Sequence, residues 1–379
     1  MDTTHWTHWR SQFPILERAN YLNSCSLGAL SRRSVERLSR FQEDWHTHGA
    51  SAWYEIWLGR LAELRGRVGG LLGAGDDEVA FSASVSAALS VIGSAIDYRH
   101  RPRVVCAELD FPTIGYQWMA RPDVEVVLVP SDDGATIDLD RWADAVDERT
   151  AAMATSHVFF TTGATQDLKS LAGIARRAGA LFIVDAYQSA GQLPVDLRGD
   201  DVDVLIAGPL KWLLGGPGLA YTTVRRELVT ELRPTITGWF GAADQFDFDI
   251  TRHQFKDDAR RFELGTPALP TVHTALGGQE IIDEIGVAAI RQRNQELTER
   301  LIERAGDAGF RFRMAPDPEA RSAIVMIAAA DPGDAVRHLG QAGIIVDARP
   351  GHVRVSPHFY NTSAEIDQVV DELARWRDG

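Results

Sequence analysis

The sequence has only two cysteines among its 379 residues, Cys25 and Cys106, and they stand far apart. A disulfide framework and a cysteine-based zinc site are therefore excluded, and we expect both thiols to be buried among apolar side chains. His5 and His8 have an i, i+3 spacing that could bind a metal. A frayed terminus is the preferred interpretation of this segment, so we expect no metal site.

The chain also lacks a long apolar run and a basic patch. No stretch approaches the roughly 20 apolar residues that a membrane-spanning helix needs, and the polar start, Met1–Gln12, has no apolar signal-peptide core. Lys plus Arg total 39 against 53 Asp plus Glu, a net charge of −14, and no basic run is interleaved with aromatic residues. We therefore expect a cytoplasmic protein that binds neither a membrane nor nucleic acid.

The length of the chain indicates more than one domain, because a single domain usually has about 100–200 residues. The composition, 45% hydrophobic and 24% charged, is typical of a fully folded protein. We predict an N-terminal segment, residues 1–28, that packs on the rest, a large domain, residues 29–268, and a small C-terminal domain, residues 269–379.

Short β-rich runs alternate with helical segments in the middle of the chain, and continuous apolar runs such as Leu181–Val184 are typical of strands covered on both faces. We therefore predict an α/β fold with a mostly parallel central sheet flanked by helices, whose ligands lie at the carboxyl ends of its strands. The predicted strands are Val79–Phe81, Val104–Ala107, Val124–Val129, Ala152–Val158, Ala180–Val184, Val202–Ala207 and Leu219–Thr223.

The pattern changes after Pro270 and predicts a smaller α+β domain. Residues Thr271–Ala305 are expected to form a long helix or a helix pair. Three strands and two helices should follow it: Ser322–Ala328, Ile344–Asp347 and Val353–Ser356 as strands, and Gly333–Gly340 and Ser363–Arg377 as helices. A further helix is expected near Arg32–His46.

Polar residues follow three of the predicted strands, and they should converge on one edge of the sheet. Lys211 would be desolvated there, which lowers its pKa and makes the amine a nucleophile able to form a Schiff base. Asp185 could keep a pyridinium nitrogen protonated, which makes pyridoxal 5'-phosphate (PLP) an electron sink. Ser84 and Ser86, with the helix that follows them, offer hydroxyl and N–H groups to a phosphate. Taken singly, these residues could equally be a surface amine, a strand-end cap and a helix N-cap.

The order and spacing of these residues resemble the class V aminotransferase family, the fold-type I PLP enzymes that include cysteine desulfurases, kynureninases and isopenicillin N epimerase-like proteins. The similar segments span nearly the whole chain: Tyr21–Gly28, Phe81–Leu89, Phe111–Thr113, Ser156–Val158 with Thr162-Gly163, Asp185–Gln188, Lys211–Gly218, Gly238–Phe240, Phe262–Thr266 and Arg354–Thr362.

The resemblance implies a role for each site residue. Lys211 is the Schiff-base and catalytic lysine, Asp185 pairs with the pyridine nitrogen, and Gln188 lies near the phenolic oxygen of the cofactor. Phe111 stacks on the cofactor ring, and an electron-poor ring favours such offset stacking. The phosphate is held by Ser84, Val85 and Ser86 and, across the interface of a homodimer with shared active sites, by Thr266. Arg354 takes the substrate α-carboxylate, to which its planar fork is suited.

The chain departs from the family pattern at two places. Gly208-Pro-Leu-Lys211 stands where members commonly have Ser-x-His-Lys, and Phe159-Phe160 stands where they have Asn-Asn. These changes remove polar groups near the cofactor and make the pocket more apolar. No cysteine follows Cys106, so the mobile cysteine that a persulfide-forming desulfurase needs in its C-terminal half is missing.

The resemblance and these departures favour a PLP-dependent enzyme that removes the α-proton of an amino acid. We expect a lyase acting at the β-carbon, either a C–S lyase or a kynureninase-like enzyme, because Phe111-Pro-Thr, Ser26-Leu-Gly and Gly238-Trp-Phe resemble the kynureninases. An aminotransferase or epimerase of the same family is the alternative, and a PLP-binding protein with impaired catalysis is a third. Tyr187, Trp239, Phe240, His358 and Tyr360 are candidates for the substrate pocket.

Overall fold

The computed structural model describes residues 3–378, so Met1 and Asp2 of the predicted N-terminal segment and Gly379 lie outside the described residues. The large part of the chain is built on one sheet of seven strands: β2 (Val79–Ser82), β3 (Arg103–Ala107), β4 (Glu125–Val129), β5 (Thr150–Ser156), β6 (Leu181–Asp185), β7 (Val204–Ala207) and β8 (Ala220–Val224). Their spatial order is β2-β8-β7-β6-β5-β3-β4. Of these strands β8 alone runs opposite to the other six, so the sheet is mostly parallel, as predicted.

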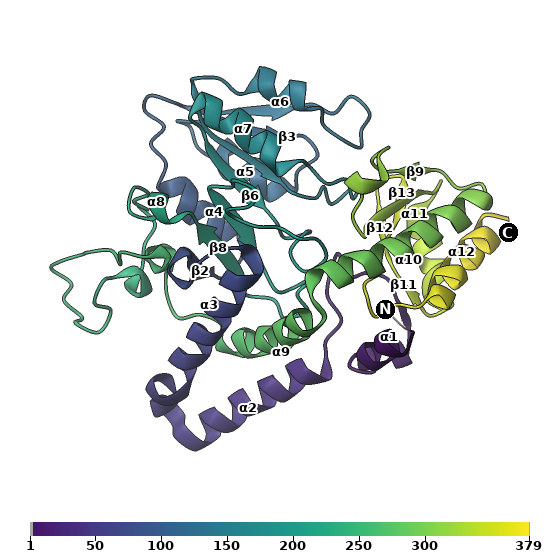
Figure 1. Cartoon of the computed structure of the whole chain (residues 1–379), viewed down its shortest axis with the longest axis horizontal. Helices are drawn as coiled ribbons and strands as arrows, with labels where there is room; N and C mark the ends of the chain where they lie inside the picture. Colours follow the sequence, from purple (N-terminus) through teal and green to yellow (C-terminus); the bar gives the residue numbers. More distant parts are fainter. Residues whose placement is uncertain (1–2, 379) are drawn as a thin grey trace.

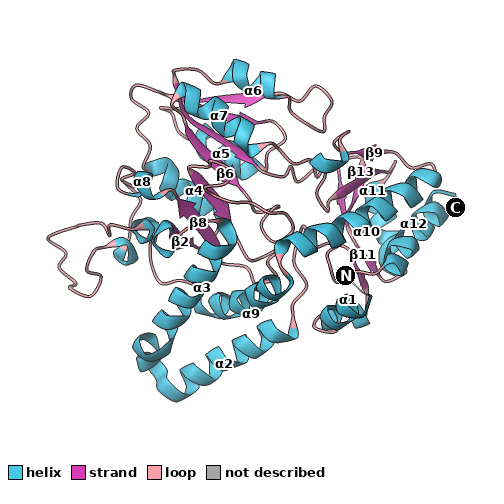
Figure 2. Cartoon of the chain, viewed as in Figure 1, coloured by secondary structure: helices cyan, strands magenta, loops and turns pink. Residues whose placement is uncertain are grey.

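Helices cover both faces of this sheet (Figures 1 and 2), which is why most residues of its central strands are buried. Side chains alternate along β3, so Val104 packs into one apolar core and Val105 into the other. The covering helices are α4 (Val85–Ser94) and α5 (Pro112–Met119) on the first face, and α3 (Leu58–Leu72), α6 (Leu139–Ala145) and α7 (Leu168–Ala178) on the second. A short helix, α8 (Arg226–Val229), follows β8.

Two long helices connect the large sheet to a smaller unit. The first, α9 (Leu269–Ile285), packs on α2 (Arg32–His48), while the second, α10 (Val287–Asp307), packs on the C-terminal helix α12 (Ser363–Asp378). They meet at Gly286, whose φ of +82° ends the first helix. The helix pair that the sequence allowed for is therefore present. Helix α9 packs into a core of the large part, and most buried apolar residues of α10 pack into the core of the smaller unit. The exact domain boundaries stay a prediction.

The smaller unit is an antiparallel sheet covered by helices, with its own apolar core. Its strands are β9 (Phe312–Arg313), β10 (Val325–Ala328), β12 (Asp347–Arg349) and β13 (His352–Val355), in the spatial order β12-β13-β10-β9. Helix α11 (Pro332–Gln341) packs beside α12. In the register of β12 and β13, Asp347 lies directly opposite Arg354.

The N-terminal segment packs on the smaller unit, and the interpretation of its start as a frayed terminus was wrong. Residues Thr3–Arg10 form α1, whose Trp6 and Trp9 side chains are buried. Arg10 binds Glu365 of α12, with its Nη2 2.9 Å from Oε1. Further along, β1 (Asn20–Tyr21) pairs in parallel with β11 (Ile344–Ile345). The two tryptophans explain why this segment is ordered, because burial of their apolar rings offsets the conformational entropy that the segment loses.

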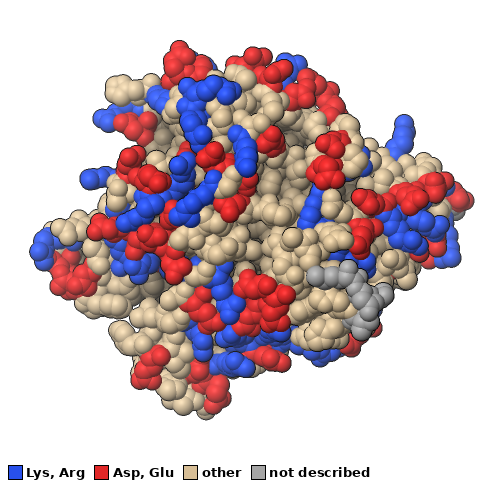
Figure 3. All heavy atoms as spheres, viewed as in Figure 1, with Lys and Arg blue, Asp and Glu red and all other residues tan. Residues whose placement is uncertain are grey.

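On the face drawn in Figure 3, acidic and basic side chains are interspersed rather than gathered by sign. Many charged side chains of the protein form ion pairs, such as Arg300 with Asp367 and Arg141 with Asp132. In residues 3–378, no helix combines the length and the apolar character needed to cross a bilayer.

Candidate active site

A cavity of about 250 Å³ opens at the carboxyl edge of the large sheet, where the sequence predicts the ligand site. Lys211, Asp185, Gln188, Phe111 and the Ser84–Ser86 turn all line it. The other lining residues are Thr113, Ser156, Val158, Phe160, Tyr187 and Leu210. Seven residues predicted to bind the cofactor are therefore brought together by the fold.

Lys211 reaches this cavity from the loop that follows β7. Burial lowers the pKa of its amine to about 8, while the charge of Asp185 and the nearby Cys25 act in the opposite direction. The amine nitrogen Nζ lies 4.8 Å from the centre of the Tyr187 ring. Lys211 is thus a desolvated amine with a raised neutral fraction near neutral pH, as nucleophilic attachment to a carbonyl requires.

Asp185 ends β6 and is nearly fully buried. One carboxylate oxygen, Oδ1, accepts the backbone N–H of Tyr187 at 2.8 Å. Burial raises the pKa of Asp185, whereas this hydrogen bond and the charge of Lys211 lower it. A buried carboxyl group that faces a cavity in this way can pair with a ring nitrogen and keep it protonated.

Gln188 follows in the turn after β6, and its amide is held from two sides. Its Nε2 donates to the backbone carbonyl of Cys25 at 3.0 Å, and its Oε1 accepts from Trp212 Nε1 at 2.9 Å. The amide therefore ties the N-terminal segment to the residue after Lys211. Its predicted place beside the phenolic oxygen of the cofactor stays a prediction.

The Ser84–Ser86 turn begins helix α4. Ser84 Oγ accepts the N–H of Ala87 at 3.2 Å as the N-cap, and Ser86 Oγ lies 2.9 Å from Thr113 Oγ1. The first N–H groups of a helix have no partner within the helix, so this end of the cavity suits an anion. The sequence names Thr113 only as part of the similar segment Phe111–Thr113 and gives it no role, because its contact with Ser86 joins residues that are distant in the chain.

Phe111 forms the outer wall of the cavity and keeps 46% of its surface exposed. Its ring meets Phe160 edge to face, with ring centres 5.1 Å apart. The loop is fixed by the preceding Asp110, whose Oδ1 accepts the N–H of Ser156 at 2.7 Å. Burial raises the pKa of Asp110 to about 7, against the effect of its hydrogen bonds. A half-exposed aromatic face is therefore held in place beside Lys211.

Arg354 does not line this cavity, and its guanidinium is already bonded within the chain. Nε and Nη2 donate to the two carboxylate oxygens of Asp347 at 2.9 and 2.6 Å. Nη2 also donates to Ser26 Oγ at 2.7 Å, and Nη1 to the carbonyl of Phe160 at 3.0 Å. The predicted contact with a substrate carboxylate therefore requires that Asp347 share or yield this arginine.

Thr266 also lies outside the Lys211 cavity, in a separate hollow with Trp239, Phe240 and Phe246. Of the predicted pocket aromatics only Tyr187 lines the cavity. His358 is instead buried between Trp212 and Asn294, and the Tyr360 hydroxyl is bonded to Ser24. The five aromatic candidates for the substrate pocket therefore lie in different places: one in the Lys211 cavity, two in the separate hollow and two in the core.

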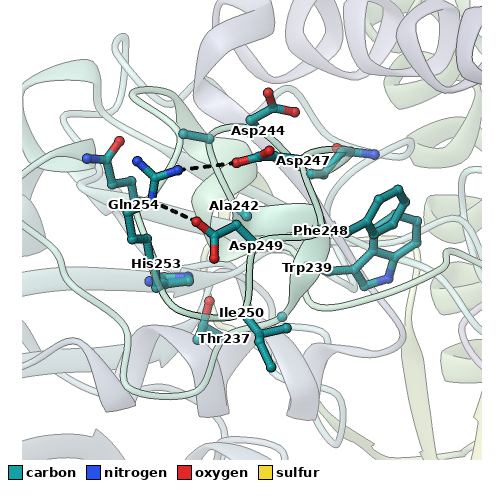
Figure 4. A pocket seen from close by; sticks show the side chains of 14 residues that line it. Thr237, Trp239, Ala242, Asp244, Asp247, Phe248, Asp249, Ile250, His253 and Gln254 are labelled. Carbon is teal, nitrogen blue, oxygen red and sulfur yellow. Dashed lines mark hydrogen bonds and ion pairs between the residues drawn. The ribbon is translucent and has the colours of Figure 1, made fainter.

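Figure 4 shows a second and larger hollow, of about 600 Å³, enclosed by the loop Thr237–Gln254. None of the residues that line it also lines the Lys211 cavity. Asp247 and Asp249 point toward Arg252, whose nearest nitrogens are 3.7 and 2.8 Å away. Two of its acidic side chains, Asp247 and Asp249, are therefore paired with a cation of the same loop, while Asp244 Oδ1 accepts the backbone N–H of Phe246. Nothing in this hollow resembles the Lys211 constellation.

Comparisons with known proteins agree with this geometry. The family model described as aminotransferase class-V matches residues 29–369. A Bacillus subtilis protein named uncharacterized aminotransferase YcbU is 33% identical, over 97% of this chain and 96% of its own length. The kynureninase of Geobacillus thermodenitrificans is 27% identical, over 97% of this chain and 90% of its own.

Two solved structures share the fold, each at 20% identity and a TM-score of 0.88. One is the cysteine desulfurase of Thermococcus onnurineus, which covers 97% of this chain and matches over 96% of its own. The other is a variant of C-DES with glycine covalently linked to its PLP cofactor, which covers 96% of this chain and matches over 98% of its own.

The chain belongs to the class V aminotransferase family. It is accordingly a PLP-dependent enzyme, a lyase or an aminotransferase, with the fold-type I architecture, and the predictions of family, fold and cofactor are confirmed. The residues present fit PLP, because one cavity offers a buried amine, a buried carboxyl group, an aromatic face and the N-terminus of a helix. The role of each of these residues toward the cofactor stays a prediction.

Proposed function

We propose that this enzyme acts on an amino acid, with Lys211 as the covalent attachment point of PLP and as the acid and base at the substrate Cα. The observation that carries the proposal is the joint placement of Lys211 and Asp185 in one cavity at the carboxyl edge of the sheet. PLP supplies an electron sink for the carbanion left by proton removal. Asp185 holds its ring nitrogen protonated, and Phe111, Ser84, Val85, Ser86 and Gln188 orient it.

The chain offers a sharp test of this attachment, because it has three lysines in all: Lys169, Lys211 and Lys256. Borohydride reduction of the PLP-loaded protein should fix the cofactor on the peptide that contains Lys211. Lys211→Ala should abolish the label and the yellow colour, while Lys169→Ala and Lys256→Ala should keep both. A label on either of the other lysines would exclude the assignment.

We further propose cleavage at the β-carbon, as in a C–S lyase or a kynureninase. Kynureninases are among the relatives, and the two cysteines, Cys25 and Cys106, are both fully buried, which disfavours either as an acceptor of persulfide sulfur. An amino-acid screen should follow the leaving group and the remaining product separately. Stoichiometric release of a β-substituent supports a lyase, whereas keto acid with pyridoxamine phosphate supports an aminotransferase and loss of chirality an epimerase. A cofactor spectrum that no amino acid changes would indicate impaired catalysis.

A homodimer with shared active sites belongs to the same proposal. Thr266 lies outside the Lys211 cavity of its own chain, next to the loop Thr237–Gln254 (Figure 4). Two apolar side chains of this loop are strongly exposed, Phe248 at 74% and Ile250 at 99%. Side chains of this kind favour burial against a second copy of the chain.

Light scattering tests this assembly. Ile250→Asp should shift the protein toward the monomer, whereas the control Leu139→Asp, at an exposed position of α6, should not. A wild-type monomer at micromolar concentration would contradict the homodimer and leave Thr266 without a phosphate to bind. Residence in the cytoplasm remains part of the proposal and is open to cell fractionation.

A further inference from the structure

Tyr187 connects the two groups on which the proposed function rests. Its backbone N–H donates to Asp185 Oδ1 at 2.8 Å, and its ring centre lies 4.8 Å from Lys211 Nζ. The ring also lines the cavity. One residue of the turn after β6 therefore contacts both the buried carboxyl group and the buried amine.

The Tyr187 ring stands in space that a side chain at residue 208 would fill. A Cβ built on Gly208 would lie 2.3 Å from Tyr187 Cε2, far inside van der Waals contact, and would also lie close to the Leu219 carbonyl oxygen, at 3.0 Å, and to Tyr187 Cδ2, at 3.2 Å. The φ of Gly208 is not positive, so the backbone conformation itself does not demand glycine. The absence of a side chain at residue 208 is explained mainly by the Tyr187 ring, which lies closest to the place that its Cβ would take.

The ring offers Lys211 an aromatic face and no charge. Burial and the neighbouring Asp185 both raise the pKa of the Tyr187 hydroxyl far above physiological pH, so the phenol stays neutral. Tyr221 on β8 is fully buried, and among the described residues its hydroxyl has no hydrogen-bond partner. An aromatic face attracts an ammonium group through the ring quadrupole, and the attraction strengthens away from water.

We propose that Tyr187 is a positioning residue for Lys211, which holds the amine against the wall of the cavity and favours its protonated form. The ring can do so because Gly208 leaves room for it, and the proposal rests on the proposed attachment of PLP to Lys211. The other groups whose charge Lys211 feels are Asp185 on β6, Cys25 on the N-terminal segment, Arg349 on β12 and Arg354 on β13. A substitution of Tyr187 removes none of these groups.

Competitive labelling of the cofactor-free protein with trace acetic anhydride tests the proposal, with Lys169 and Lys256 as internal references. Lys211 in Tyr187→Leu should titrate about half a unit to one and a half units lower than in the wild type. Tyr187→Phe keeps the aromatic face and should titrate like the wild type. An unchanged titration in Tyr187→Leu, or an equal shift in Tyr187→Phe, overturns the proposal.

A double-mutant cycle tests whether the missing side chain at Gly208 makes room for the Tyr187 ring. Gly208→Ala should displace it, and so lower the Lys211 titration and weaken PLP retention measured by absorbance. Adding Gly208→Ala to Tyr187→Leu should change little further, because the two substitutions remove the same contact. Fully additive effects of the two substitutions, or a Gly208→Ala variant that behaves like the wild type, would contradict this role of Gly208. If the labelling results hold but PLP is found on another lysine, the proposed function fails while the Tyr187 contact stands.

Discussion

Asp347 binds the guanidinium of Arg354 through both carboxylate oxygens, at 2.9 and 2.6 Å, and a second arginine, Arg349, lies 3.1 Å from the same carboxylate. Two positive charges therefore share one negative charge close to the cavity. The positive charge of each arginine also lowers the pKa of the Lys211 amine. The surplus positive charge suits a substrate carboxylate, while Asp347 competes for the same donors.

Asp347→Asn removes this competitor, so an amino-acid substrate should bind roughly tenfold more tightly, a change of about 1.4 kcal/mol. Titration of the loaded enzyme, followed by the cofactor spectrum, gives the dissociation constant. The corresponding amino-acid amide has no carboxylate and serves as the control, with affinity unchanged. Equal changes for acid and amide would mean that Asp347 does not compete with the α-carboxylate.

The two arginines should differ in what they contribute to stability. Arg354→Lys should lower the free energy of unfolding by about 3 kcal/mol, because a lysine cannot serve Asp347, Ser26 and Phe160 together and leaves buried polar groups unpaired. Arg349 keeps 29% of its side chain exposed, so Arg349→Lys should cost less than about 1 kcal/mol. Urea denaturation of the cofactor-free protein measures both values, and equal losses would contradict the buried network.

The lowered pKa of Lys211 predicts a pH dependence with a definite sign. The pKa is about 8 in the folded protein against the ordinary value of 10.5, so between these values the unfolded chain holds more protons. The stability of the wild type relative to Lys211→Met should therefore rise as the pH increases from 8 to 10.5. The rate of PLP attachment should show its inflection near pH 8, in stopped-flow absorbance. An inflection near 10.5 would indicate an amine in contact with water.

Much of the large sheet could be predicted because its strands are buried on both faces and so keep continuous apolar runs. The prediction of one strand at Ile344–Asp347 was wrong: β11 pairs with β1, and β12 with β13, and neither partner is visible in local sequence. For the same reason the pairing of Arg354 with Asp347 could not be foreseen, since it depends on cross-strand register. Lys211 and Asp185 could be placed together because Asp185 ends β6, Lys211 follows β7, and these parallel strands end at one edge of the sheet.

The exposed face of Phe111 predicts a contribution to cofactor affinity. Phe111→Leu should raise the dissociation constant of PLP about 2- to 10-fold, since aromatic pairs contribute about 0.5–1.5 kcal/mol beyond the area they bury. Fluorescence titration of the cofactor-free protein measures it. Tyr116→Leu, an exposed position on α5 outside the cavity, is the matched control and should leave the affinity unchanged. If both variants bind PLP like the wild type, Phe111 is not the stacking residue.

Ser86 and Thr113, whose hydroxyls lie 2.9 Å apart at the N-terminus of α4, should distinguish PLP from pyridoxal, which has no phosphate. Ser86→Ala and Thr113→Val should each raise the dissociation constant of PLP roughly tenfold or more, because a hydrogen bond to a charged group contributes about 1.5–3 kcal/mol. Binding of pyridoxal should hardly change. Ser90→Ala, one turn further along α4 and bonded to Gln117, is the control. Equal losses for PLP and pyridoxal would show that the pair supports the helix rather than binding the phosphate, because only the phosphate differs between the two ligands.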